Sequence, residues 1–198
     1  MSDPAIALVE FDSISAGIVA GDAMIKSSPV AAIYAGTVHP GRYLVLVRGD
    51  TASVEVALEV GRETGREHIV DSVFLADVHP DVTEAIAGNR TRAPLRGESL
   101  GIVESLSVAA AIDAADAGAK TADVMVSSVS LADGLGGKGY VLFSGSLAEV
   151  EAAVEAAVAR VTPHGALVRA DTIAQLHDEM AENLGAQLRF LERIDQGR

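Results

Sequence analysis

The chain has 198 residues, of which 49% are hydrophobic and 4% aromatic, and this length suits one large domain or two domains of about 100 residues each. Its formal net charge of −13 repels phosphate backbones and anionic lipid surfaces, so we expect neither a nucleic-acid partner nor a membrane partner. The absence of cysteine excludes disulfides, thiolate nucleophiles and cysteine-bound metal sites.

The N-terminal sequence MSDPAIALVEFDS predicts no targeting segment, because it has no basic region and no apolar run of signal-peptide length. The most apolar stretches, such as SVAAAIDAADAGA, are broken by aspartates within a few residues and therefore predict no membrane span. We expect a cytoplasmic protein.

The chain begins with a predicted strand and helix. Residues 5–10 are apolar and end in glutamate, which is typical of a short buried strand. A helix follows, with isoleucines recurring about once per turn from a cap at Asp12 or Ser13. Pro29 marks its end, because proline disrupts a helix.

Two strands, a helix and a final strand complete the first half. The strands are predicted at 30–34 and 43–48, and the segment AGTVHPG between them predicts a loop. Asp50 is expected to cap a helix whose apolar residues recur at helical spacing. A strand at 69–75 closes the unit, which gives the order βαββαβ.

The second half of the chain repeats the first. Ten of the 24 residues from 7 to 30 recur unchanged 94 positions later. Nine of the 21 residues from 41 to 61 recur 96 positions later, so the second copy has two additional residues between these segments. Asp22 and Lys26 recur as Asp116 and Lys120, and this charged spacing is not a coincidence of alanine richness.

The repeat predicts two tandem domains of an α+β fold, each a ferredoxin-like-related βαββαβ unit. We place the first domain at 1–90 and the second at 98–198, with an exposed linker at 88–97 that is rich in Gly, Pro and Arg. Apolar residues at helical spacing from Thr172 to Leu191 predict a further C-terminal helix.

No motif indicates catalysis or a cofactor. GLGGKG at 134–139 matches the expression G-x-G-x-x-G, but it is followed by a predicted strand, whereas a dinucleotide site opens a helix. The five histidines lack the spacing of metal ligands. We therefore predict no catalytic residue, no metal and no cofactor, and the sequence argues against an enzyme.

Both halves resemble a known family, the bacterial microcompartment shell domain. The resemblance is carried by ALVEFDSISAGIVAGDAMIKSSPV and GRYLVLVRGDTASVEVALEVG in the first half, and by GIVESLSVAAAIDAADAGAKTADV and GKGYVLFSGSLAEVEAAVEAA in the second. Each half begins with the glutamate-terminated strand and the Asp–Lys helix. The chain thus resembles the unpermuted tandem type rather than the circularly permuted one.

The resemblance implies a structural function. Single-domain members of this family form flat hexamers, so a tandem chain is expected to form a homotrimer, or pseudohexamer, with six domains around one axis. The tile would have a central pore for small metabolites and would lie in a microcompartment shell in the cytoplasm. Its expected partners are other shell proteins and, in addition, encapsulated enzymes.

The resemblance also assigns site residues. The family's pore is lined by the loop between the hairpin strands, which here comprises His39, Pro40, Gly41, Gly134, Leu135, Gly136 and Gly137. Lys26 and Lys120 match the lysine that contacts neighbouring tiles. His79, before Pro80, stands where members often carry an edge arginine, and VRADT in the second half offers no counterpart. A further hypothesis is that three copies of His39 bind an anion or metal ion, or gate the pore by protonation.

An alternative function belongs to a different class. Because βαββαβ units also serve as effector-binding modules, the chain could be a soluble oligomeric small-molecule-binding or regulatory protein of ferredoxin-like fold. The alternative predicts discrete oligomers with saturable ligand binding, whereas a shell protein assembles laterally into sheets.

Overall fold

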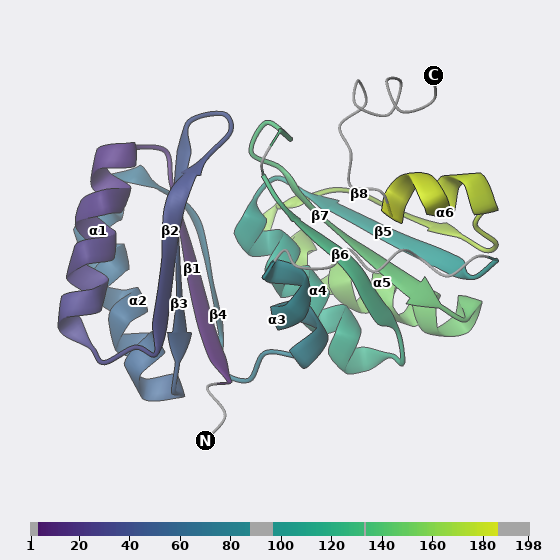
Figure 1. Cartoon of the computed structure of the whole chain (residues 1–198), viewed down its shortest axis with the longest axis horizontal. Coiled ribbons are helices and arrows are strands. Elements are labelled where there is room, and N and C mark those ends of the chain that lie inside the picture. The colour runs from purple at the N-terminus through teal and green to yellow at the C-terminus, as the bar shows by residue number, and fades with distance from the viewer. Residues whose placement is uncertain (1–3, 88–96, 133, 186–198) are drawn as a thin grey trace.

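A computed structural model of the chain describes residues 4–87, 97–132 and 134–185. Two α+β domains lie side by side, each with a four-stranded antiparallel sheet that carries two helices on one face (Figure 1). The predicted fold class is confirmed. Within the described residues, none of the helices combines the length and apolar character needed to cross a membrane.

The first domain follows the predicted order and adds one short helix. Its sheet has the strand order β2-β3-β1-β4. Ser13, and not Asp12, caps the first helix by accepting a hydrogen bond from the Ala16 amide at 3.3 Å, and Asp50 caps the second. The elements are β1 (Ala5–Phe11), α1 (Ile14–Ser27), β2 (Ala32–Val38), β3 (Arg42–Gly49), α2 (Thr51–Gly65), β4 (Ile69–Leu75) and α3 (Pro80–Ile86).

The second domain repeats this topology with the strand order β6-β7-β5-β8. Ser107 caps its first helix as Ser13 does in the first domain. The elements are β5 (Ser99–Ser105), α4 (Val108–Thr121), β6 (Met125–Leu131), β7 (Gly139–Gly145), α5 (Leu147–Val161), β8 (Leu167–Ile173) and α6 (Asp178–Gly185). Each element of the first domain therefore has one counterpart in the second.

The predicted hairpin loop was too long. AGTVHPG was expected to be a loop throughout, but β2 continues through Val38 and pairs with β3 as far as Arg42. Only three residues, 39–41, lie between the two strands. The glycine within this strand, Gly36, is accommodated because the cross-strand hydrogen bonds of β3 outweigh its low strand propensity.

The predicted C-terminal helix began too early. Thr172 and Ile173 belong to β8 and pair with β5, and the helix starts at Asp178. Alternating apolar residues in a short segment fit a strand as well as a helix, and the open edge of β5 decided between them. Leu191 and most of the predicted linker lie outside the described residues. Helix α3 was not predicted.

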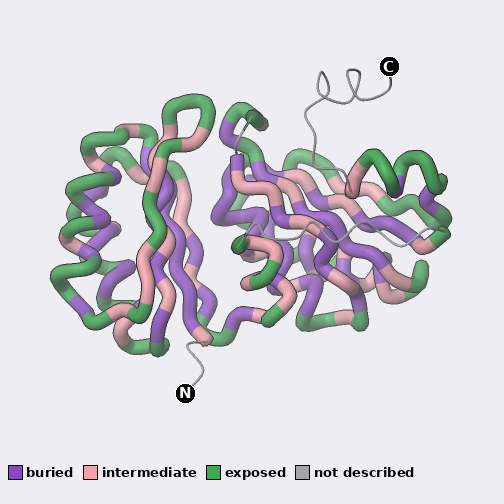
Figure 2. The backbone as a smooth tube through the Cα atoms, in the orientation of Figure 1, coloured by how far each residue is buried: buried purple, intermediate pink, exposed green. Residues whose placement is uncertain are grey.

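The two faces of the first sheet have different partners. Side chains alternate along β1, so that Ala7 and Val9 pack under α1 and α2 whereas Ile6 and Leu8 point to the other face. We call this second face, which is turned away from α1 and α2, the outer face. The outer face of the first sheet is turned toward the second domain, and its apolar residues join a core that includes α4 (Figures 1 and 2).

Candidate functional site: the central loops and the contact between the domains

The hairpin loops of the two domains lie at the same end of the molecule (Figure 1). Nη1 of Arg42, at the start of β3, donates a hydrogen bond to the carbonyl oxygen of Gly137 at 2.9 Å. The two predicted pore segments are thus neighbours within one chain. The glycines of these segments that the structure describes adopt positive φ angles, at which a residue with a side chain would be strained. These are Gly41, Gly134, Gly136 and Gly137.

The second loop is longer, as the sequence repeat predicts. Thr37 pairs with Tyr43 across the first hairpin and encloses five residues, 38–42, whereas Leu131 pairs with Gly139 and encloses seven, 132–138. The glycine-rich segment 134–139 leads into strand β7, which confirms that it is a hairpin loop and not a dinucleotide fingerprint. His39, Pro40, Gly41, Gly134 and Gly136 are exposed, Leu135 is half-buried and Gly137 is buried.

The loops rest on a buried carboxylate at the contact between the domains. Glu10 is the largest buried charged side chain among the described residues and is fully inaccessible to solvent. One of its carboxylate oxygens accepts a hydrogen bond from Arg42 at 3.1 Å, and the other accepts one from the backbone amide of Ala109 at 2.6 Å. Ala109 lies in the first turn of α4, where the helix dipole favours a negative charge. Glu10 therefore joins the first sheet, the loop support and the second domain.

Burial dominates the titration of this carboxyl. Loss of solvation raises the pKa of Glu10 to about 7, whereas the hydrogen bond from Ala109 and the positive charge of Arg42 act in the opposite direction. Asp71, on the neighbouring strand, adds to the increase and accepts a hydrogen bond from the hydroxyl of Ser107. The contact between the domains therefore contains an acid that titrates near neutral pH.

The other end of α4 is tied to the first domain by two of the predicted edge residues. Asp116 accepts a hydrogen bond from the backbone amide of His79 at 2.8 Å and pairs with Lys120 at 2.6 Å. The Lys120 ammonium also donates to the carbonyl oxygen of Asp77. The structure thus brings His79 and Lys120 together within one chain.

Lys26 has a different environment from its counterpart. It is exposed and pairs with Asp22 at 2.5 Å, in the same i,i+4 arrangement as Lys120 with Asp116. Its partner Asp22 lies within α1 itself, whereas Lys120 also contacts the other domain. The role of both lysines and of His79 at tile edges stays a prediction.

His79 does have a counterpart, which the sequence reasoning missed. His79 caps α3 by accepting a hydrogen bond from the Asp81 amide at 3.3 Å, and His177 accepts one from the Glu179 amide at 3.3 Å before α6. The counterpart lies at His177, after VRADT, because the final strands β4 and β8 begin 98 positions apart, at Ile69 and Leu167. The signal was the recurrence of a histidine four residues after the last residue of each final strand, Leu75 in β4 and Ile173 in β8.

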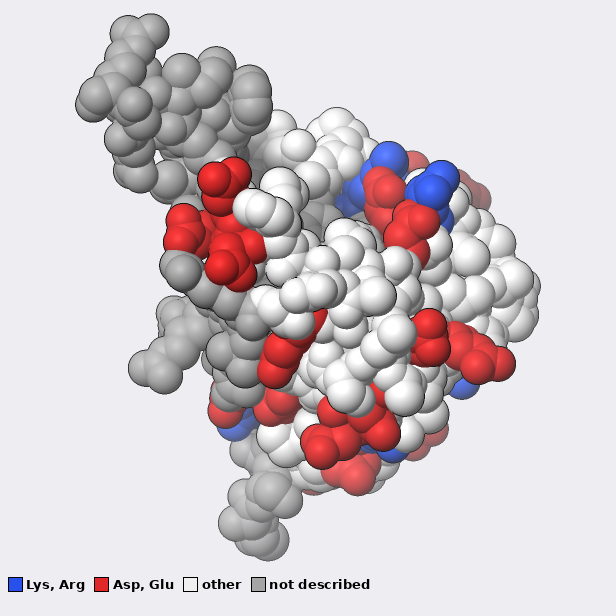
Figure 3. Space-filling view, turned by 90° about the vertical axis from the view of Figure 1, so that its right-hand side faces the viewer, with Lys and Arg blue, Asp and Glu red and all other residues white. Residues whose placement is uncertain are grey.

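The surface charge and the side-chain clusters of the part of the chain that the structure describes add no further chemistry. Among the described residues, no group of three or more His, Asp or Glu side chains could hold a metal ion. Asp and Glu side chains are spread over the end of the molecule formed by the second domain, and Lys and Arg occupy fewer places there (Figure 3). This distribution supports the expectation that nucleic acid is not a partner, which stays a prediction.

Comparisons with known proteins identify the family. The BMC domain model matches residues 5–78 and 99–176. The chain is 36% identical over 176 residues to the bacterial microcompartment shell protein PduT of Citrobacter freundii, covering 89% of this chain and 95% of that protein. A crystal structure of a microcompartment protein from Desulfitobacterium hafniense is 37% identical, has a TM-score of 0.79, and is matched over 91% of this chain and 99% of that one.

A fused permuted hexameric shell protein of the RMM microcompartment shares the fold alone, at 21% identity and a TM-score of 0.60 over 82% of this chain and 83% of that one. Each domain here begins instead with the strand that carries the repeated glutamate, Glu10 in β1 and Glu104 in β5, so the unpermuted order is confirmed. The chain belongs to the BMC-domain family, with two copies of the domain. It is a structural protein of a microcompartment shell and not an enzyme, as predicted. The domain limits 1–90 and 98–198 stay a prediction.

Glu10 should make stability depend on pH. Its pKa in the folded chain, about 7, exceeds the ordinary value of 4.5, so the folded state holds a proton that the unfolded chain releases between these values. We expect the free energy of unfolding to fall as pH rises from 4.5 to 7, by on the order of 3 kcal/mol from this group, and to change little from it above pH 7. Urea unfolding at pH 5, 6, 7 and 8 measures the effect.

The variant Glu10→Gln removes the titrating group but keeps an oxygen that can accept from Ala109. Its free energy of unfolding should vary less with pH than that of the wild type. Glu104→Gln is the matched control, because Glu104 is the counterpart on β5 and is partly exposed beside Lys138. An unchanged pH dependence in Glu10→Gln would contradict the assignment.

Proposed function

We propose that three chains assemble head to tail into a flat pseudohexameric shell tile, and that its central opening, lined by the hairpin loops, passes small polar metabolites. The observation that carries this proposal is the unequal burial of two equivalent helices, α1 and α4. In this proposal, the contact between neighbouring chains has the same geometry as the contact between the two domains within one chain.

Helix α4 is covered on two sides and α1 on one. Ten of the 14 residues of α4 are buried, because it lies between its own sheet and the outer face of the first sheet, whereas four of the 14 residues of α1 are buried. On α1 the side chains of Ile14, Ile18 and Ile25 are 43%, 53% and 48% exposed. Their counterparts 94 positions later, Val108, Ile112 and Ala119, are buried.

We refer to Ile14, Ile18 and Ile25 as the α1 stripe. Figure 2 shows exposed positions along the outer side of α1, in contrast to the buried α4. A contiguous apolar strip on an exposed helix is typical of an interaction surface. By analogy with α4, its partner is the outer face of a sheet.

The outer face of the second sheet is the matching surface. Glu104 on β5 is the counterpart of Glu10 and pairs with Lys138 at 2.7 Å, as Glu10 pairs with Arg42. In the proposed contact, Glu104 accepts a hydrogen bond from the backbone amide of Ser15 in the next chain, the counterpart of Ala109. Contacts of this heterologous kind form a ring when the rotation closes, and six equal sectors close with three chains.

The adjacency of the two loops supports a central opening. Because Arg42 links the first loop to Gly137 inside one chain, a ring of three chains would alternate six loops around its axis. The exposed groups there are glycine backbones, the His39 ring and Pro40, which are compatible with polar solutes. His39 interacts with another group in this structure. Its role as an anion or metal ligand stays a hypothesis.

The family membership favours the shell function over the alternative of a small-molecule-binding or regulatory protein. Shell proteins of this family assemble with one another, and we propose that this tile contacts other shell proteins through Lys26 and Lys120 and encloses enzymes. The regulatory alternative has no comparable support from the relatives.

The α1 stripe should be needed for the trimer. Ile18→Asp places a charge in the centre of the proposed contact, where it would lose its hydration. We expect sedimentation velocity to show monomers for this variant and trimers for the wild type, with unchanged circular dichroism. Val56→Asp is the control, because Val56 is an exposed apolar residue on α2, outside the stripe. A trimeric Ile18→Asp would contradict the proposed interface.

Lys26 and Lys120 should be needed for contacts between tiles and not for contacts within one tile. In Lys26→Ala with Lys120→Ala we expect trimers to persist, because the apolar contacts of α1 and α4 remain, while sheets fail to form at high concentration. Negative-stain electron microscopy distinguishes discs from sheets. Arg66→Ala removes one exposed positive charge outside α1 and α4 and serves as the control. Normal sheets from the double variant would refute the edge assignment.

A further inference from the structure

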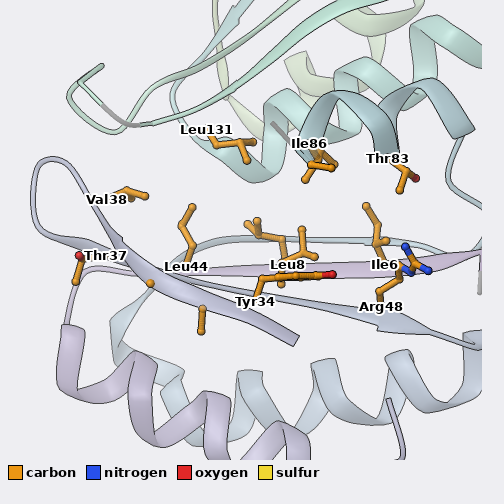
Figure 4. Close-up of a pocket in the computed structure, with 14 residues that line it drawn as sticks. Ile6, Leu8, Tyr34, Thr37, Val38, Leu44, Arg48, Thr83, Ile86 and Leu131 are labelled. Carbon is orange, nitrogen blue, oxygen red and sulfur yellow. The ribbon is translucent and has the colours of Figure 1, made fainter. Parts of the chain in front are cut away.

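The first domain contains a cavity of about 500 Å³, a volume typical of small-molecule sites. It lies between the outer face of the first sheet, helix α3 and the end of β6 (Figure 4). Most of the side chains around it are apolar. They include Ile6, Leu8, Leu44, Leu46, Ile86 and Leu131.

Arg48 on β3 brings a positive charge to one end of this cavity. It is the only charged residue among the described residues that line the cavity. Its Nε atom is buried and has no hydrogen-bond partner among the described residues. A buried donor without a partner destabilises a protein, so such a group points to a missing acceptor. In Figure 4 the hydroxyl of Tyr34 is directed toward the same end of the cavity as Arg48.

The second domain provides an internal comparison. The counterpart of Arg48, 96 positions later, is Ser144, and its hydroxyl is hydrogen-bonded to that of Ser127 at 2.8 Å. The part of the outer face that corresponds to this cavity is filled there, since Leu100 and Leu142 form a cluster with residues of the α6 region. Among the described residues, the first domain thus has a buried Arg48 Nε without a hydrogen-bond partner, whereas the second domain has a neutral pair that is hydrogen-bonded.

The position of α3 explains why the first domain is open. Val82 of α3 is fully buried in the core shared with the second domain, and α3 contacts both β6 and α4. Its counterpart α6 places Ala181 in the cluster on its own sheet. Contact with the second domain therefore holds α3 away from the first sheet, and the space beneath it remains open.

We propose that this cavity binds a monocarboxylate with an apolar body. A carboxylate matches the planar fork of a guanidinium and would supply the acceptor that Arg48 lacks. The apolar walls favour a hydrocarbon or aromatic body. A phosphate would bring a second negative charge without a second cation, within a chain of net charge −13. A neutral apolar molecule would leave the Arg48 donor unpaired.

The site is independent of the trimer but close to the loops. All of its described walls come from one chain, so binding does not require the proposed assembly. Two of its lining residues, Val38 and Leu131, end the strands that lead into the two hairpin loops. The end of the cavity opposite Arg48 therefore lies at the base of both loops (Figure 4).

Octanoate is a suitable probe, with 1-octanol as its uncharged equivalent. Isothermal titration calorimetry of the full chain should show binding of octanoate that weakens at least tenfold in Arg48→Met, which keeps an apolar stem of similar length. Arg66→Met, an exposed arginine outside the cavity, should bind like the wild type. Methyl NMR should place the octanoate-induced shifts at Ile6, Leu8 and Ile86.

The outcomes separate this proposal from the proposed shell tile. Without ligand, Arg48→Met should be at least as stable to heat as the wild type, because it removes a buried unpaired donor. Octanoate binding that is equal in Arg48→Met and wild type, equal affinity for 1-octanol, shifts outside the cavity or no binding at millimolar concentration would each overturn the proposal. Sedimentation of the same samples reports on the trimer independently.

Discussion

The contact between the outer face of the first sheet and helix α4 organises the molecule. It buries α4 between two sheets and places a carboxylate, Glu10, at the start of that helix. Asp116 and Lys120 make the polar contacts at its other end. Apolar burial supplies most of the stability, whereas these directional groups fix how the domains sit against each other. The adjacency of the two loops follows, because Arg42 contacts both Glu10 and Gly137.

Duplication of one domain allows the two copies of this contact to differ. Inside the chain, a buried glutamate pairs with an arginine, and at the free end of the second sheet a partly exposed glutamate pairs with Lys138. The strand position that carries Asp71 in the first domain carries Arg169 in the second. Such differences make the two faces chemically distinct, which favours a fixed order of domains around a ring.

The exposed α1 stripe gives the proposed assembly its free energy. Covering half-exposed isoleucines removes apolar area from water and contributes roughly 1 kcal/mol for each side chain. This gain is modest for a single contact, but each chain contributes one α1 and one free sheet face, and closure of a ring satisfies every such surface. The carboxylate cavity differs because it is complete within one chain, and it arises where α3 leaves its own sheet to pack on the second domain.

The sequence alone determined the duplicated α+β architecture, the family and the position of the hairpin loops. Apolar periodicity, the cap at Asp50 and the glycine-rich turns are local features that neighbouring residues decide, whereas the sequence left Asp12 and Ser13 as alternative caps of the first helix. The two copies of the glutamate were indistinguishable in sequence, and only the tertiary structure showed that Glu10 is buried while Glu104 is not. The partners of Glu10 and Lys120, and the lack of a partner for Arg48 Nε among the described residues, were likewise beyond sequence reasoning. Burial and hydrogen bonding depend on residues such as Ala109, which lies 99 positions from Glu10 and meets it only when the two domains pack together.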